Sequence, residues 1–252
     1  STLERRKTGP PLRFYRSSHQ LAGDWQVFET RYRETDLWIR ARRNLEREAL
    51  EAVMKYRRQI EDAISRNPDF LHALHPLPDV PLAPRIVRRM LLAARVAGVG
   101  PMAAVAGALA QAVAEDLEPW SPALIIENGG DCFLNLQETV TVGVYAGPAS
   151  PFAHRIALRF EAHRFPMAIC TSSGTIGHSL SFGKADAVTV VSRDGALADA
   201  AATSIGNLVR TRGDIAAALD AARSMEGIEG ALVLIGDKLG VWGDMELAPP
   251  EG

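Results

Sequence analysis

The stretch AVTVVSRDGALADAAAT, residues 187–203, is the most informative part of the chain for its fold. Its first six residues are mostly β-branched or small, which is typical of a buried strand. Small and apolar residues then predict a helix from Ala196 to Val209. Asp199 and Thr203 are four residues apart, so both side chains would lie on one face of that helix. The stretch therefore predicts a strand followed closely by a helix that carries two oxygen-bearing side chains.

Strands predominate on either side of this stretch, and the helices are grouped. A helix after Asn44 that ends at residues 66–68 and helices over 84–98, 102–114 and 214–224 are predicted. Strands are predicted over 25–33, 35–43, 123–127, 132–136, 139–145, 154–160, 166–171, 187–192, 231–235 and 239–245. Runs of strands with grouped helices favour an α+β fold over a doubly wound parallel sheet. Residues 1–22 are expected to form a loose arm and residues 23–252 a single domain, with a sub-boundary in the Pro-rich loop 67–84.

The overall composition limits the classes of function. The chain has 252 residues, 47% hydrophobic and 23% charged, with a net charge of −2, so nothing indicates a nucleic-acid partner. Cys132 and Cys170 lack the spacing of a zinc site and cannot form a disulfide framework. The basic N-terminal stretch lacks an apolar core, and no run is long enough to span a membrane. We expect a cytoplasmic protein without a membrane partner.

Two glycine-bearing segments have both a binding and a structural interpretation. Gly98, Gly100 and Gly107 lie at or near the start of a small-residue helix. The N-terminus of this helix could bind a phosphate, or its small side chains could allow another backbone segment to pack closely against it. Asn128, Gly129, Gly130 and Asp131 follow a predicted strand, where they form either a ligand-binding turn or a plain hairpin turn.

A third segment combines hydroxyl groups with glycines. A predicted strand ends in Thr171, Ser172, Ser173, Gly174 and Thr175, with further Gly and Ser residues after them. Hydroxyls and backbone amides together can bind a pyrophosphate. His178 lies in the same loop and could transfer a proton near neutral pH, although a lone histidine is often only a hydrogen-bonded surface residue.

Asp199 and Thr203 have oxygen ligands of the kind that magnesium binds. The structural alternative makes Asp199 a favourable acid near the start of a helix and Thr203 a core residue. Spacing alone favours the structural alternative.

Read in order, these segments resemble the ApbE-like superfamily, best known for magnesium-dependent FAD:protein FMN transferases. The resemblance runs from about Gly98 to Asn207 and is carried by residues 128–131, 171–174, 187–191 and 197–203. Within the superfamily, the whole chain is most similar to a smaller ApbE-related group, which the stretch Glu34-Thr35-Asp36-Leu37 also fits.

The resemblance implies a T-fold-related core and a nucleotide cleft with Mg²⁺ at its floor. It assigns Asp199, Thr203 and a main-chain carbonyl near Ala104 or Ala106 to the metal. Gly100, residues 128–131 and residues 171–175 would then bind FAD or a related flavin or pterin nucleotide. His178 would be the catalytic residue, matching the histidine of the transferases' His-Ile-Ile-Asp-Pro segment.

The sequence departs from the transferases at two places. Their Lys-Gly-Tyr-Ala-x-Asp stretch reads AGALAQ here, residues 106–111, and Ser181 stands where their segment has Asp. Three functions stay open: a nucleotide- or cofactor-binding protein, either a binder alone or an enzyme on a small molecule; a cytoplasmic FMN transferase with an acceptor protein; and a non-catalytic assembly factor. If the chain is an enzyme, the resemblance implies Mg²⁺-dependent transfer. The sequence leaves a homo-oligomer open.

Overall fold

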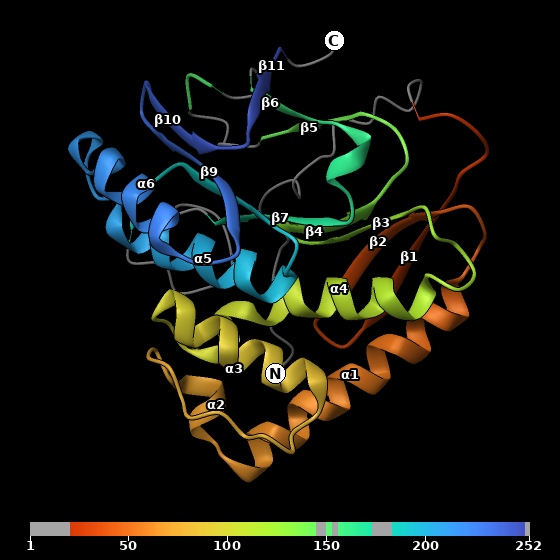
Figure 1. Ribbon diagram of the computed structural model, residues 1–252. Coiled ribbons are helices and arrows are strands. Elements are labelled where there is room, and N and C mark those ends of the chain that lie inside the picture. The colour runs from red at the N-terminus through yellow and green to blue at the C-terminus, as the bar shows by residue number, and fades with distance from the viewer. Residues whose placement is uncertain (1–20, 145–149, 153–155, 173–182, 250–252) are drawn as a thin grey trace, which may run out of the picture.

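The computed structural model of the protein describes residues 21–144, 150–152, 156–172 and 183–249. Within these ranges the chain forms two antiparallel sheets, and helices cover one face of the larger sheet (Figure 1). The predicted α+β class, with antiparallel sheets and packed helices, is confirmed.

The larger sheet has eight strands in the order β1-β2-β3-β4-β7-β8-β9-β10. Every neighbouring pair in it is antiparallel. Its strands are β1 Gln26–Tyr32, β2 Thr35–Ala41, β3 Leu124–Asn128, β4 Asp131–Asn135, β7 Met167–Ser172, β8 Ala187–Ser192, β9 Ile228–Ile235 and β10 Lys238–Gly243. The smaller sheet has the order β11-β6-β5, with β5 Val140–Gly143, β6 Ala157–Phe160 and β11 Glu246–Ala248.

The helices form two layers on one face of the large sheet. They are α1 Glu46–Arg66, α2 Asp69–His72, α3 Arg85–Ala97, α4 Val105–Leu117, α5 Gly195–Leu208 and α6 Ile215–Ser224, with short 3-10 turns η1 Pro101–Ala104, η2 Ala162–Arg164 and η3 Arg212–Asp214. Helices α4 and α5 pack directly on the strands, α4 on β3 and β4 and α5 on β7 and β8. Helix α3 covers the outer side of α5, and α1 packs against α4 and β1 (Figure 1).

The alternation of side chains along each strand divides the interior into two cores. In β7, Ala168 and Cys170 face the helices, whereas Met167 and Ile169 face the smaller sheet. The same alternation holds in β4, where Phe133 faces the helices and Cys132 faces the smaller sheet. The two cysteines therefore lie on opposite faces of the sheet, and both are buried free thiols.

Most predicted elements are present, and the exceptions have local causes. Strand β8 has the predicted ends, and α3 lies within the predicted range 84–98. The predicted helix 102–114 begins instead as the 3-10 turn η1, with Pro101 at its first position, and continues as α4 from Val105. The predicted strand 239–245 is divided between β10 and β11, which belong to different sheets, and Gly243 between them has a φ of 86°.

The Pro-rich loop 67–84 packs on the same core as the helices. It contains the short helix α2, whose Phe70 is buried, and Leu77 and Ala83 pack against the same hydrophobic cluster. No single helix among the described residues is long and apolar enough to cross a membrane; α3 and the segment from η1 to α4 reach that length only as a pair bent by 106°.

Candidate functional site

Several predicted segments meet at one end of the large sheet. Residues 128–131 form the turn between β3 and β4, and Asp131 pairs with Cys170 near the end of β7. Strand β2 begins at the same end, because Leu37 pairs with Asn128. The Asn128 amide Nδ2 donates a hydrogen bond of 3.2 Å to the Ala106 carbonyl at the start of α4. The turn is thereby attached to the first turn of α4.

Helices α4 and α5 cross at two glycines. A Cβ atom on Gly107 would overlap the Gly195 carbonyl oxygen, and a Cβ on Gly195 would come close to the Gly107 carbonyl oxygen. Only glycine lets the two backbones come this close. The structural interpretation of the small-residue segment, a tight contact with another backbone, is therefore confirmed.

This contact places Asp199 at the start of α4. Its Oδ2 accepts a hydrogen bond of 2.9 Å from the Gly107 amide. The first amides of a helix lack partners within the helix and carry partial positive charge, so a carboxylate is stabilised there. The sequence suggested that these amides could bind a phosphate; in the structure the Asp199 carboxylate already occupies the Gly107 amide.

Gln111 makes the reciprocal contact. Its Oε1 accepts a hydrogen bond of 2.8 Å from the Gly195 amide at the start of α5, and its Nε2 donates to Glu115 at 3.1 Å. Each helix thus supplies a side chain to the N-terminus of the other. Gln111 stands where the transferases have an acid, and the sequence alone predicts no role for it. Gly195 leaves room for Gln111 to reach the backbone, but this proximity arises from the fold and has no signal in the local sequence.

Asp131 is the second carboxylate on the helix-facing side of the sheet. It is only 7% exposed, and its Oδ1 has no hydrogen-bond partner among the residues that the structure describes. Burial raises the pKa of Asp131 from its usual 3.8 to about 7, while the Cys170 thiol and the Thr171 amide oppose this by favouring the ionised form. At neutral pH this carboxyl group is therefore partly protonated.

The two carboxyl groups influence each other. Burial raises the pKa of Asp199 well above its usual value, and the negative charge of Asp131 raises it further, while the amides of Gly107 and Ala106 oppose the shift. Cys170 pairs with Asp131 in the sheet, and its Sγ is 3.9 Å from the Gly195 carbonyl on α5. Burial, followed by the charges of Asp131 and Asp199, raises the pKa of this thiol well above its usual value, so it stays neutral.

The third segment is only partly described. The Thr171 hydroxyl is hydrogen-bonded to the Thr189 hydroxyl at 2.9 Å. Thr171 follows Cys170 in the strand, so its side chain points to the smaller sheet and away from Asp131 and Asp199, whereas Ser172 points to the helix side. The predicted residues Ser173, Gly174, Thr175 and His178 lie outside the described residues.

The remaining predicted residues have structural surroundings of their own. Gly100 packs against the Ala73 backbone, because a Cβ there would overlap the Ala73 carbonyl oxygen. Ala104 is fully buried at the N-cap of α4. Thr203 is 6% exposed and lies one turn after Asp199 on α5. The 128–131 turn and Asp199 are thus brought together, and Thr203 lies on the same helix as Asp199.

Among the described residues, no group of three or more His, Cys, Asp or Glu side chains could hold a metal ion. A cation at Asp199 would therefore need hydroxyl, carbonyl, water or ligand oxygens as well. Magnesium commonly binds in this way, through one or two carboxylates together with waters and phosphates.

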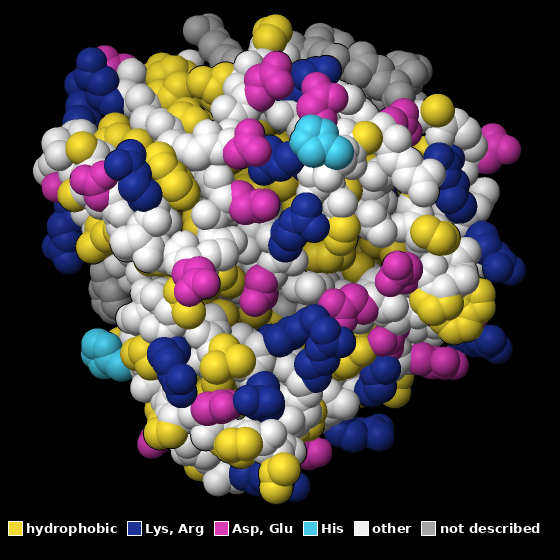
Figure 2. Space-filling model, in the orientation of Figure 1, with side chains coloured by type: hydrophobic (Ala, Val, Ile, Leu, Met, Phe, Trp, Pro, Cys, Tyr) yellow, Lys and Arg dark blue, Asp and Glu magenta, His cyan; other side chains and the backbone are white. Residues whose placement is uncertain are grey.

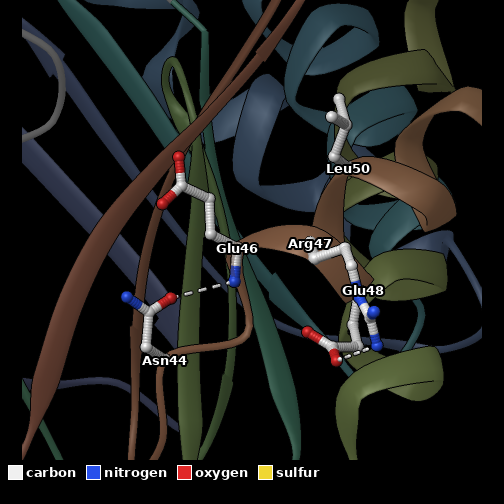
Figure 3. A pocket seen from close by; sticks show the side chains of 5 residues that line it. All are labelled: Asn44, Glu46, Arg47, Glu48 and Leu50. Carbon is white, nitrogen blue, oxygen red and sulfur yellow. Dashed lines mark hydrogen bonds and ion pairs between the residues drawn. The ribbon is translucent and has the colours of Figure 1, made fainter.

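The surface away from this region is mixed in charge. On the face seen in Figure 2, acidic and basic side chains are interspersed. Arg89 on α3 forms an ion pair with Glu115 on α4. A shallow depression at the start of α1 is lined by Asn44, Glu46, Arg47, Glu48 and Leu50 (Figure 3). It follows the Ala41 end of β2, which pairs with Leu124, so it lies at the opposite end of the strands from Asn128 and Asp131.

Comparisons of the sequence identify close relatives. The profile of the family described as AbpE bacteria matches residues 18–241. UPF0280 protein MJ1526 of Methanocaldococcus jannaschii is 41% identical over 202 residues, which cover 78% of this chain and 82% of that protein. A UPF0280 protein of Methanococcus maripaludis is 44% identical over 196 residues, covering 76% of this chain and 79% of that protein.

Comparisons of the structure give more distant likenesses. The flavin transferase ApbE of Vibrio cholerae is 12% identical, with a TM-score of 0.46, over 90% of this chain and 97% of that chain. The flavinyl transferase ApbE of Pseudomonas stutzeri is 12% identical, with a TM-score of 0.48, over 87% and 94%.

Proposed function

The chain belongs to the family described as AbpE bacteria, and we propose that it binds a flavin- or pterin-type nucleotide together with Mg²⁺ where α4, α5 and the β3–β4 turn meet. We further propose that the protein acts as an enzyme on a small molecule.

One observation carries this proposal. Asp131 and Asp199 are 68 positions apart by their numbers, yet both lie beside the first turn of α4, Asp199 through the Gly107 amide and the Asp131 turn through Asn128 and Ala106. Both carboxyl groups are more than nine-tenths buried. Burying two acids together costs several kcal/mol unless a cation or a proton compensates them. Such an arrangement is typical of a functional site rather than of a core built for stability.

The donor groups are compatible with Mg²⁺. Asp199 and Thr203 supply a carboxylate and a hydroxyl from successive turns of α5, and the α4 start supplies backbone carbonyls. One oxygen of Asp199 accepts from the Gly107 amide, but a carboxylate has about four acceptor sites, so further ones are open to a cation. Among the candidate carbonyls, that of Ala106 already accepts from Asn128, and a carbonyl oxygen has a second lone pair.

When bound, Mg²⁺ would neutralise phosphate charge and polarise the pyrophosphate. The chain's own residues would hold the site in shape. The Gly107 amide orients Asp199, and Asn128 ties the β3–β4 turn to α4. The Gly107–Gly195 contact keeps the two helices at a fixed separation. In this proposal the hydroxyl-rich loop after Ser172 contacts the phosphates, and His178 carries the proton if a reaction takes place.

Identification of a co-purified ligand tests the proposal. The purified protein would be examined by absorbance, and any released small molecule by mass spectrometry. A bound flavin or pterin nucleotide supports the proposal, and yellow protein containing FAD points further to FMN transfer onto an acceptor. Protein that carries no ligand, binds neither FAD nor FMN and does not respond to Mg²⁺ would contradict it and favour a non-catalytic assembly factor.

A further inference from the structure

Asp131 has an acceptor atom that the described structure does not use. Its Oδ1 is buried without a hydrogen-bond partner, and the whole residue is 7% exposed. A buried acceptor without a partner is unfavourable, and more so when it is charged, so it calls for an explanation. An Asn in place of Asp131 could form the same turn without burying a second charge, so the turn alone does not require an acid here.

The side chain points toward the junction of α4 and α5. Asp131 pairs with Cys170 in the sheet, so the two side chains lie on the same face, and the Cys170 Sγ is 3.9 Å from the Gly195 carbonyl of α5. The charge of Asp131 acts directly on Asp199 and on Cys170. The unpartnered oxygen therefore belongs to the same buried space as the Asp199 carboxyl group.

No basic side chain compensates these two acids within the described part of the chain. Neither Asp131 nor Asp199 forms an ion pair with a Lys or Arg there, and the charges acting on Asp199 are those of Asp131 and backbone amides. Where the two carboxyl groups are ionised, they would repel an incoming pyrophosphate, and only a bound cation or a proton can compensate them. The electrostatics thus favour a cation that is already bound when the nucleotide arrives.

We infer that Asp131, through Oδ1, and Asp199 together bind one divalent cation in the absence of nucleotide, so that the nucleotide enters a site already loaded with the cation. The inference rests on the proposed function, because it adds Asp131 as a ligand to the same site. The remaining positions of the cation would be filled by water or by neutral oxygens, which later give way to phosphate oxygens.

Manganese is a suitable probe, because the electron paramagnetic resonance signal of free aqueous Mn²⁺ is lost on binding. Nucleotide-free protein stripped with EDTA would be titrated with Mn²⁺. Wild type is expected to bind one ion, and Asp131→Asn and Asp199→Asn are each expected to weaken binding by at least about tenfold. The matched control is Glu127→Gln, a buried acid at the neighbouring end of β3 whose side chain faces the smaller sheet; it should bind Mn²⁺ like wild type.

Thermal unfolding gives a second readout that reports folding in the same samples. Mn²⁺ should raise the melting temperature of wild type and of Glu127→Gln, and leave that of Asp131→Asn unchanged. Absence of Mn²⁺ binding by wild type, or wild-type binding by folded Asp131→Asn, would overturn the inference. Wild type that binds FAD only with Mg²⁺ but takes up no Mn²⁺ alone would overturn it and leave the proposed function intact. Mn²⁺ uptake by wild type that binds no nucleotide would support the cation site and contradict the proposed function.

Discussion

Asp199 on α5 accepts a hydrogen bond of 2.9 Å from the backbone amide of Gly107, the third residue of α4. The contact is possible because Gly107 and Gly195 lie against each other where the helices cross. A carboxylate so placed is stabilised by the start of a helix that is not its own. Any role of Asp199 toward a ligand must therefore be separated by experiment from this structural role.

The helix crossing itself can be tested with Gly107→Ala. The added methyl group would overlap the Gly195 carbonyl oxygen and press on the Asp199 Cβ, which lies 2.8 Å from the Cβ position. Because backbone atoms must then move, we expect a loss of about 1–3 kcal/mol in the free energy of unfolding. Urea denaturation would measure it. Gly213→Ala is the matched control, since its Cβ would meet only the Thr211 hydroxyl at 3.6 Å. Equal stability of the two variants would contradict the described crossing.

The two buried acids predict how stability depends on pH in metal-free protein. The folded-state pKa of Asp131 is raised from 3.8 to about 7, and that of Asp199 is raised as well. The folded protein therefore binds more protons than the unfolded chain above pH 3.8, and the free energy of unfolding falls as the pH rises from about 4 through 7. The slope is at most about 1.4 kcal/mol per pH unit for each extra proton held.

Denaturation in EDTA at pH 5 and pH 8 would test this dependence. Asp131→Asn should lose less stability than wild type between these two values, because it removes one raised pKa and the charge that raises the other. The exposed acid Asp220 on α6 provides a control: Asp220→Asn should follow wild type. A wild-type protein that gains stability from pH 5 to pH 8 would show that the two carboxyl groups are not buried together.

His178 separates an enzyme from a binding protein, although it lies outside the described residues. If the protein turns over a flavin or pterin nucleotide, His178→Ala should keep ligand affinity within a few-fold and lower turnover by about 10²–10⁴-fold, the usual contribution of general acid–base catalysis. Assays with FAD, then with other flavin and pterin nucleotides, in the presence of Mg²⁺ would measure both. Wild-type turnover by His178→Ala would assign the proton transfer to another residue.

The sequence predicted local features well because they depend on neighbouring residues. The strand 187–192 follows from its apolar run, and the shared helix face of Asp199 and Thr203 follows from helical spacing. The two-core organisation was not predicted, because alternation in a fully buried strand does not reveal which face meets helices. The division of residues 239–245 between two sheets depends on the pairing of β11 with β6, which lies far earlier in the sequence, whereas β10 pairs with the adjacent strand β9.

The candidate site was predicted only in part for the same reason. The small residues around Gly107 indicated a close backbone contact, but only the fold shows that the partner is Gly195 and that Asp199 thereby reaches the α4 amides. The unpartnered oxygen of Asp131 and the contact of Gln111 with α5 are tertiary features without a signal in the local sequence. The single domain over residues 23–252 stays a prediction.

The central claim is that Asp199 has two roles. It accepts the hydrogen bond from the Gly107 amide, and it also binds a cation that holds the nucleotide. Calorimetric titration of FAD into wild type and Asp199→Asn, each in Mg²⁺ and in EDTA, tests it most directly. Asn keeps an oxygen that can accept from the Gly107 amide and removes one of two repelling charges, so the variant should unfold at no lower temperature. We predict tight binding only for wild type with Mg²⁺, with a loss of at least about tenfold in EDTA and in the variant under both conditions. Equal FAD affinity of wild type and Asp199→Asn in Mg²⁺ would contradict the claim and leave Asp199 as the acid that stabilises the start of α4.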